Sequence, residues 1–83
     1  MEFIMLRLKD GTIVIHGGYD LKLDAKDENL VVENSLVEII IKPPLTKEEI
    51  TNLLEEIREK FGSDAAEKLS NLLKTIPISA YSD

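Results

Sequence analysis

The sequence predicts an α+β domain: an antiparallel β-meander of about five strands over residues 2–42, covered on one face by a C-terminal αα-hairpin. Three observations predict this class. Apolar side chains before Pro43-Pro44 alternate with a period of two, as they do in strands. Over residues 46–61 and 63–75 they recur at three- and four-residue steps, as they do on one face of a helix. Finally, Asp10-Gly11 lies between two β-rich runs, which is the strongest short-range signal of a hairpin.

The first hairpin is expected to join residues 2–9 to residues 12–16 through a two-residue Asp10-Gly11 turn. That turn pairs Leu8 with Ile13, and every second residue then shares a face. The face predicted to meet the helices carries Ile4, Leu6, Leu8, Ile13 and Ile15. The opposite face is mixed and carries Phe3, Met5, Arg7, Lys9, Val14 and His16.

A glycine pair interrupts the pattern after this hairpin. Gly17-Gly18 permits a bulge or a sharp bend, and residues 19–24 then alternate strictly between apolar and polar side chains. We therefore expect a third strand, followed by a polar, acidic loop over residues 25–29. The glycine pair leaves open whether the sheet stays flat or curls into a small half-barrel.

A second hairpin is expected to complete the sheet. Residues 30–33 and 36–42 read as strands joined by Asn34-Ser35, a weaker turn than Asn-Gly but equally short. A two-residue Asn34-Ser35 turn also fixes which residues of this hairpin share a face. On its last strand, the apolar face carries Val37, Ile39 and Ile41. Pro43-Pro44 ends the sheet, because proline lacks a backbone donor and restricts the residue before it.

The two helices have clear start and stop signals. Thr46 lies three residues before Glu49, which is the spacing of a capping box. Gly62 can close the first helix, and Pro77 ends the second. The apolar stripes are Ile50, Leu53, Leu54, Ile57 and Phe61, and then Ala65, Leu69, Leu72, Leu73 and Ile76. We expect one domain over residues 1–83, with a β part (1–42), a helical part (46–76) and a tail (77–83).

Composition excludes several classes of function. The 83 residues contain no cysteine, so a thiolate metal site and a cysteine nucleophile are excluded. The net charge is −6, and acids outnumber bases both in residues 1–43 and in residues 44–76, which argues against a nucleic-acid ligand. A DNA-reading helical pair is disfavoured too, because the exposed side of residues 63–75 combines two acids with two bases. No apolar run is long enough for a signal peptide or a membrane span, and we expect a cytoplasmic protein. Abundant Glu, Lys and Ile without Gln is typical of thermophilic proteins.

Candidate chemistry is sparse. His16 is the only histidine, and no nucleophile–base pair can be named around it, so we predict a protein that is not an enzyme and binds no cofactor. An alternative is a module for a small ligand or a divalent cation, centred on residues 16–29, because carboxylates suit hard cations. Its candidate ligands are Asp20, Asp24, Asp27 and Glu28. Their spacing does not fit an EF-hand loop, and the simpler interpretation is a solvated acidic loop.

Surplus apolar surface leads to the main functional hypothesis. Two short helices can cover only one face of the sheet, yet apolar side chains are expected on the other face and in the tail. These candidates for an interaction surface are Phe3, Met5, Val14, Val31, Leu36, Ile40 and Tyr81. We therefore predict a small acidic protein–protein interaction module, a homodimer, suited to act as an inhibitor or adaptor of a basic partner. The competing interpretation is that a bent sheet wraps on itself and hides these residues.

Overall fold

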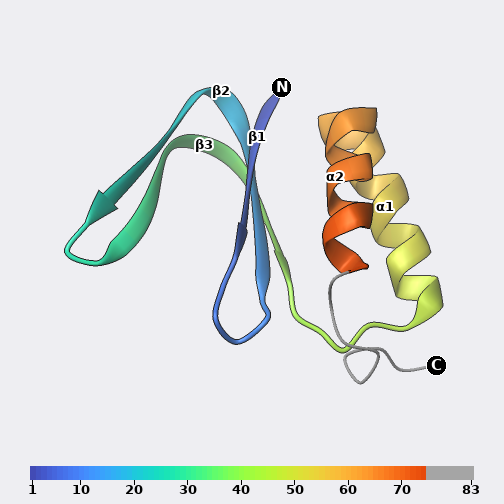
Figure 1. Cartoon of the computed structure of the whole chain (residues 1–83). Helices are drawn as coiled ribbons and strands as arrows, with labels where there is room; N and C mark the ends of the chain where they lie inside the picture. Colours follow the sequence, from blue (N-terminus) through green and yellow to red (C-terminus); the bar gives the residue numbers. More distant parts are fainter. Residues whose placement is uncertain (75–83) are drawn as a thin grey trace.

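The computed structural model describes residues 1–74 and has one antiparallel sheet and two helices. The elements are β1 (Glu2–Arg7), β2 (Ile13–Lys26), β3 (Asn29–Ile41), α1 (Lys47–Phe61) and α2 (Ser63–Leu73). The strands lie in the order β1-β2-β3. Figure 1 shows both helices on the same side of the sheet. The predicted α+β class and the C-terminal position of the helices are confirmed, but the described residues form three strands and not five.

Two predicted strand breaks are bends inside longer strands. Gly17 and Gly18 lie within β2, where the pairing with β3 shifts register. A Cβ on Gly18 would lie 2.5 Å from the Asn34 carbonyl oxygen, so the two strands approach closely here. Asp20 and Asn34 take left-handed backbone angles, and Asn34 Nδ2 donates to the Asp20 carbonyl at 2.8 Å. The Asn34-Ser35 turn predicted from the sequence is therefore wrong, because this hydrogen bond holds a bend across two continuous strands.

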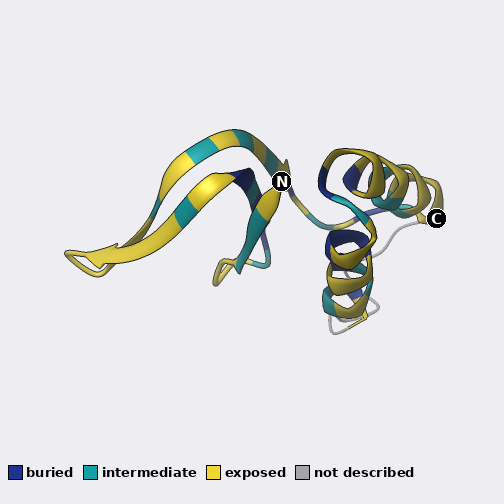
Figure 2. Ribbon diagram, turned by 90° about the horizontal axis from the view of Figure 1, so that it is seen from above, coloured by how far each residue is buried: buried dark blue, intermediate teal, exposed yellow. Residues whose placement is uncertain are grey.

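Beyond the bend, the β2–β3 hairpin forms a long projection. We call residues 19–35 the arm; it curves away from the helices (Figure 1) and is exposed along most of its length (Figure 2). Lys26 pairs with Asn29, which leaves Asp27 and Glu28 as a two-residue turn. Their φ angles of 50° and 70° suit a type I′ turn. The predicted 25–29 loop is thus a tight turn at the tip of the arm.

The first hairpin has a register one residue away from the predicted one. The Leu8 N–H donates to the Thr12 carbonyl at 2.7 Å, which closes a three-residue turn with Gly11 at a φ of 92°. Arg7 consequently pairs with Ile13. Thr12 N–H donates to Asp10 Oδ1 at 2.9 Å, and this bond lowers the pKa of the Asp10 carboxyl below its ordinary value.

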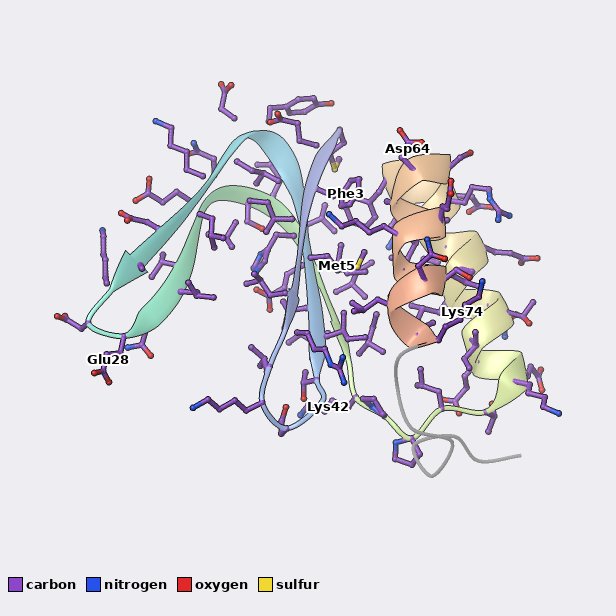
Figure 3. All side chains as sticks on the ribbon, viewed as in Figure 1. Phe3, Met5, Glu28, Lys42, Asp64 and Lys74 are labelled. Carbon is purple, nitrogen blue, oxygen red and sulfur yellow. The ribbon has the colours of Figure 1, made fainter. Side chains whose placement is uncertain are left out.

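This shift turns the whole of β1 over, because neighbouring residues of a strand point to opposite faces. Phe3 and Met5 point toward the helices (Figure 3) and pack against the core. The prediction that Ile4, Leu6 and Leu8 meet the helices is therefore wrong. Each face of β1 combines apolar side chains with one charged residue, Glu2 on one face and Arg7 on the other, so the sequence pattern does not distinguish the two faces. The buried apolar core consists of Ile13, Ile15, Ile41, Leu45, Ile57, Phe61, Ala65, Ala66, Leu69 and Leu73.

The helices begin and end close to the predicted residues. Glu49 N–H donates to Thr46 Oγ1 and Thr46 N–H donates to Glu49 Oε1, both at 3.0 Å, so the predicted capping box is confirmed. Gly62, with a φ of 99°, donates its N–H to the Arg58 carbonyl at 3.0 Å and lets α2 begin at the next residue. The Phe61 ring packs directly against Gly17. This contact brings the C-terminal end of α1 against the bend of the sheet.

Removing the α1 cap should weaken the fold measurably. Thr46→Ala leaves the Glu49 N–H without its acceptor, and we expect it to lower the free energy of unfolding by about 1 kcal/mol. Urea denaturation followed by circular dichroism measures the change. The control is Thr51→Ala, because Thr51 lies inside α1 and its exposed hydroxyl donates only to the Lys47 carbonyl. Equal losses for the two variants would show that the cap contributes nothing.

Candidate interaction surface

The sheet face opposite the helices carries an uncovered apolar row. Leu6, Val14 and Ile40 lie side by side across the three strands. Leu6 and Val14 are half-buried, whereas Ile40 is 55% exposed. Leu8 is 45% exposed and lies two residues beyond Leu6 along the chain, next to the β1–β2 turn. Within the described part of the chain, no helix covers these side chains.

The arm faces this row across a groove. The groove has a volume of about 390 Å³, and its walls are residues 6–9 on one side and residues 28–30 at the arm tip on the other. Leu30, which is 57% exposed, lines it. Leu23 and Val32 pair with each other two residues nearer the bend than Leu30. Because alternate residues of a strand point to the same side, both share the face of Leu30. We call these side chains together the concave face: Leu6, Leu8, Val14, Leu23, Leu30, Val32 and Ile40.

The interaction residues predicted from the sequence lie on different faces of the structure. Val14 and Ile40 lie on the concave face, whereas Phe3 and Met5 belong to the core side. Val31 lies on the opposite face of the arm, and Leu36, at the bend, is 68% exposed. Tyr81 lies outside the described residues.

Five members of the concave face are not among the interaction residues predicted from the sequence: Leu6, Leu8, Leu23, Leu30 and Val32. The two-residue turn predicted from the sequence places Leu6 and Leu8 on the helix-facing side, but the observed turn is one residue longer. Leu23 belongs to a different predicted strand from Leu30 and Val32, whereas the structure joins the two strands in one hairpin. Once the arm is recognised as one hairpin, the alternation of apolar residues on both its strands places Leu23 and Leu30 on a common face.

His16 has structural partners beside the bend. Its Nδ1 lies 2.9 Å from Ser35 Oγ and 3.7 Å from Glu38 Oε2. The Ser35 hydroxyl donates to the Val37 carbonyl at 3.2 Å, so its oxygen is left to accept from the Nδ1–H of His16. The imidazole therefore ties β2 to β3 where the arm begins.

The four acidic residues proposed as cation ligands are spread along the arm. Asp20 lies at the bend, Asp24 accepts from the Ala25 N–H at 3.0 Å, and Asp27 and Glu28 form the tip. All four are exposed. Within residues 1–74, no three His, Asp or Glu side chains lie close enough together to hold one metal ion. The structure does not bring these carboxylates together at one site.

The outer surfaces of the helices are polar and locally paired. Glu48, Glu55 and Glu59 are exposed on α1, and Glu56 accepts from Lys60 Nζ at 2.9 Å. On α2, Lys68 Nζ lies 5.7 Å from the centre of the Phe3 ring, so this lysine packs toward the sheet. These contacts are typical of solvated helix surfaces, and the exposed apolar side chains are concentrated on the sheet.

Comparison of the chain with protein-family models, with curated proteins and with solved structures finds no match. Neither helix of residues 1–74 is long and apolar enough to cross a bilayer.

Proposed function

We propose that this chain is a small acidic, non-catalytic protein–protein interaction module that acts as a homodimer and holds a segment of a partner protein on its concave face. One observation carries the proposal: the apolar side chains of the concave face lie on the side of the sheet that the helices leave open. Exposed apolar side chains gathered on one face mark interaction sites in soluble proteins.

The groove has the composition of a binding surface. Leu6, Leu8 and Leu30 make its apolar walls, while Lys9 and Glu28 bring opposite charges to its rim. An apolar centre with a polar rim is the usual organisation of a protein–protein interface. The curvature of the arm presents side chains from two directions, so an extended segment would contact both walls at once.

Charge favours a basic partner. The net charge of −6 attracts a positively charged protein over a distance of about 10 Å at moderate ionic strength. Such attraction acts mainly on the association rate and weakens as salt is added. Binding at the concave face would then retain the partner through apolar contact, which salt does not screen.

The absence of catalysis is part of the proposal. His16 is the only histidine, and its Nδ1 is engaged with Ser35 and lies near Glu38. Its partners lie on the two strands that it holds together beside the bend. This arrangement supports a structural role for the imidazole.

Capture experiments with two neighbouring residues test the proposed surface. Leu30→Glu places a carboxylate on the concave face, and Val31→Glu places the same group on the opposite face of the arm. We expect immobilised wild-type chain to retain a partner from an extract of its native host, identified by mass spectrometry. With that partner purified, Leu30→Glu should raise the Kd at least about tenfold, because it buries an unpaired charge, and Val31→Glu should not. Equal Kd values for the two variants, or no retained partner, would contradict the proposal.

A further inference from the structure

We infer that the homodimer forms by antiparallel pairing of β3 with β3 of a second copy, with Ile40 on the two-fold axis, which extends the sheet from three strands to six. The inference rests on the proposed homodimer and adds the surface and the register through which it forms. The evidence is the open edge of β3, a hollow beside that edge and the charges on either side of Ile40.

β3 has an open edge in the described part of the chain. It is the last strand of the sheet, and within residues 1–74 its only strand partner is β2. Residues 36–41 are apolar except for Glu38, with no proline or lysine to discourage pairing before Lys42. Proteins usually protect such edges with charges or proline, so an apolar edge of this length favours pairing with another strand.

The β1 edge is a poorer candidate for the same contact. β1 has six residues and carries a charged residue at each end, Glu2 and Arg7. β3 has thirteen residues and ends in three successive isoleucines. The part of β3 outside the arm, residues 36–41, has Glu38 as its one charged residue and offers more apolar side-chain burial than β1, so we assign the interface to β3.

A hollow beside this edge has room for the side chains of a partner strand. It has a volume of about 290 Å³ and lies between β3 and α1. Its apolar lining is Ile40, Ile41, Leu45 and Leu53, and its polar lining is Glu49, Asn52 and Glu56 of α1. In the paired sheet, Ile39 and Ile41 of the second copy lie on the helix-facing side, next to this lining. The second copy would therefore extend the core of the first one past the edge of β3.

Charge selects one register among the two-fold possibilities. In an antiparallel pair with a two-fold axis through the sheet, the residue on the axis faces its own copy. An axis at Glu38 would place two carboxylates opposite each other, which is destabilising. An axis at Ile39 would pair Glu38 with the partner's Ile40 and give the carboxylate no opposite charge. An axis at Ile40 pairs Glu38 with the partner's Lys42 twice, and opposite charges directly across two strands are stabilising.

The same register covers exposed apolar surface. Ile40, which is 55% exposed, would face Ile40 of the second copy. Ile39 would face the partner's Ile41 on the helix side. Lys42, directly after the end of β3 (Figure 3), and Glu38 are both exposed, so both side chains can reach across the open edge. Glu38 Oε2 lies 3.7 Å from His16 Nδ1 of the same copy, and the cross-strand pair would add to this contact.

Single cysteines test the register directly, because the chain has none of its own. In Ile40→Cys, the two Cα atoms across the axis should lie about 5 Å apart, within reach of a disulfide. In the matched variant Leu36→Cys, the two positions should lie about 27 Å apart, since eight residues of strand separate them. We expect mild oxidation to give a covalent dimer with Ile40→Cys and little or none with Leu36→Cys, as seen on a non-reducing gel.

A charge swap gives a second, independent readout. Glu38→Lys places lysine opposite lysine at two positions, and we expect the dimer Kd to rise about tenfold. The double variant Glu38→Lys/Lys42→Glu restores opposite charges and should return the Kd to within about threefold of the wild-type value. Sedimentation equilibrium measures the Kd, and circular dichroism checks that each chain is folded.

The outcomes separate this interface from the proposed function. A dimer that Ile40→Cys fails to cross-link, or that Leu36→Cys cross-links equally well, overturns the β3 interface but leaves the homodimer standing. A chain that remains monomeric at several hundred micromolar overturns both. Failure of the Leu30→Glu test with an intact β3 dimer overturns only the concave-face part of the proposed function.

Discussion

Replacement of Gly17 by alanine is expected to lower the free energy of unfolding by about 3 kcal/mol, because a Cβ at this position would overlap the Phe61 ring. Gly17 and Phe61 are both buried, so the ring cannot move aside without leaving the core. Glycine-to-alanine changes also stabilise proteins through the unfolded chain, but by less than about 1 kcal/mol. The overlap should therefore dominate, and urea denaturation measures the difference.

A double-mutant cycle separates this overlap from other effects of the substitution. In Gly17→Ala/Phe61→Leu the ring that meets the new Cβ is absent. We expect the double variant to lose at least about 1 kcal/mol less than the sum of the two single variants, because residues in direct contact are not additive. Strict additivity would show that the close approach of α1 to the bend is not what requires glycine.

Truncation of Leu69 should be one of the most damaging changes in the helices. Leu69 is fully buried in α2 at 0% exposure, and Leu69→Ala would leave a cavity that costs about 3–4 kcal/mol. A domain of this size has a stability of about 4–12 kcal/mol, so the substitution would remove between about a quarter and nearly all of it. The expected result is a large fall in the urea midpoint and in the thermal midpoint.

The matched control is the same substitution on the exposed surface. Leu36→Ala removes an identical group from a side chain that is 68% exposed, and we expect a loss below about 0.5 kcal/mol. Comparable losses at Leu36 and Leu69 would contradict the placement of the core between the helices and the helix-facing side of the sheet.

The helices could be predicted closely because their signals are local. Thr46 and Glu49 are three residues apart, and Gly62 follows the last apolar residue of its stripe, so caps and periodicity agree. The sheet depended on signals that the sequence does not resolve. Asp10-Gly11 located the first turn correctly, but the same two residues fit a two-residue or a three-residue turn.

The length of this turn decides which β1 side chains belong to the candidate interaction surface. A one-residue difference in turn length exchanges the faces of β1, so Phe3 and Met5 entered the core while Leu6 and Leu8 left it. The bends were harder to foresee, because Gly18 and Asn34 act across two strands and neither residue predicts the other alone. The general expectation of an apolar sheet face opposite the helices did not depend on either detail, and Val14 and Ile40 lie on that face.

The central claim is that one copy of this chain leaves apolar sheet surface open and a second copy covers the β3 part of it. Sedimentation equilibrium of the full chain between 1 and about 300 µM tests this most directly, with Ile40→Glu as the comparison, since that change opposes two carboxylates across the axis. The account predicts a mass twice that of the 9.3 kDa chain for the wild type, and a folded 9.3 kDa monomer for Ile40→Glu. A wild-type mass of 9.3 kDa over the whole range would contradict it.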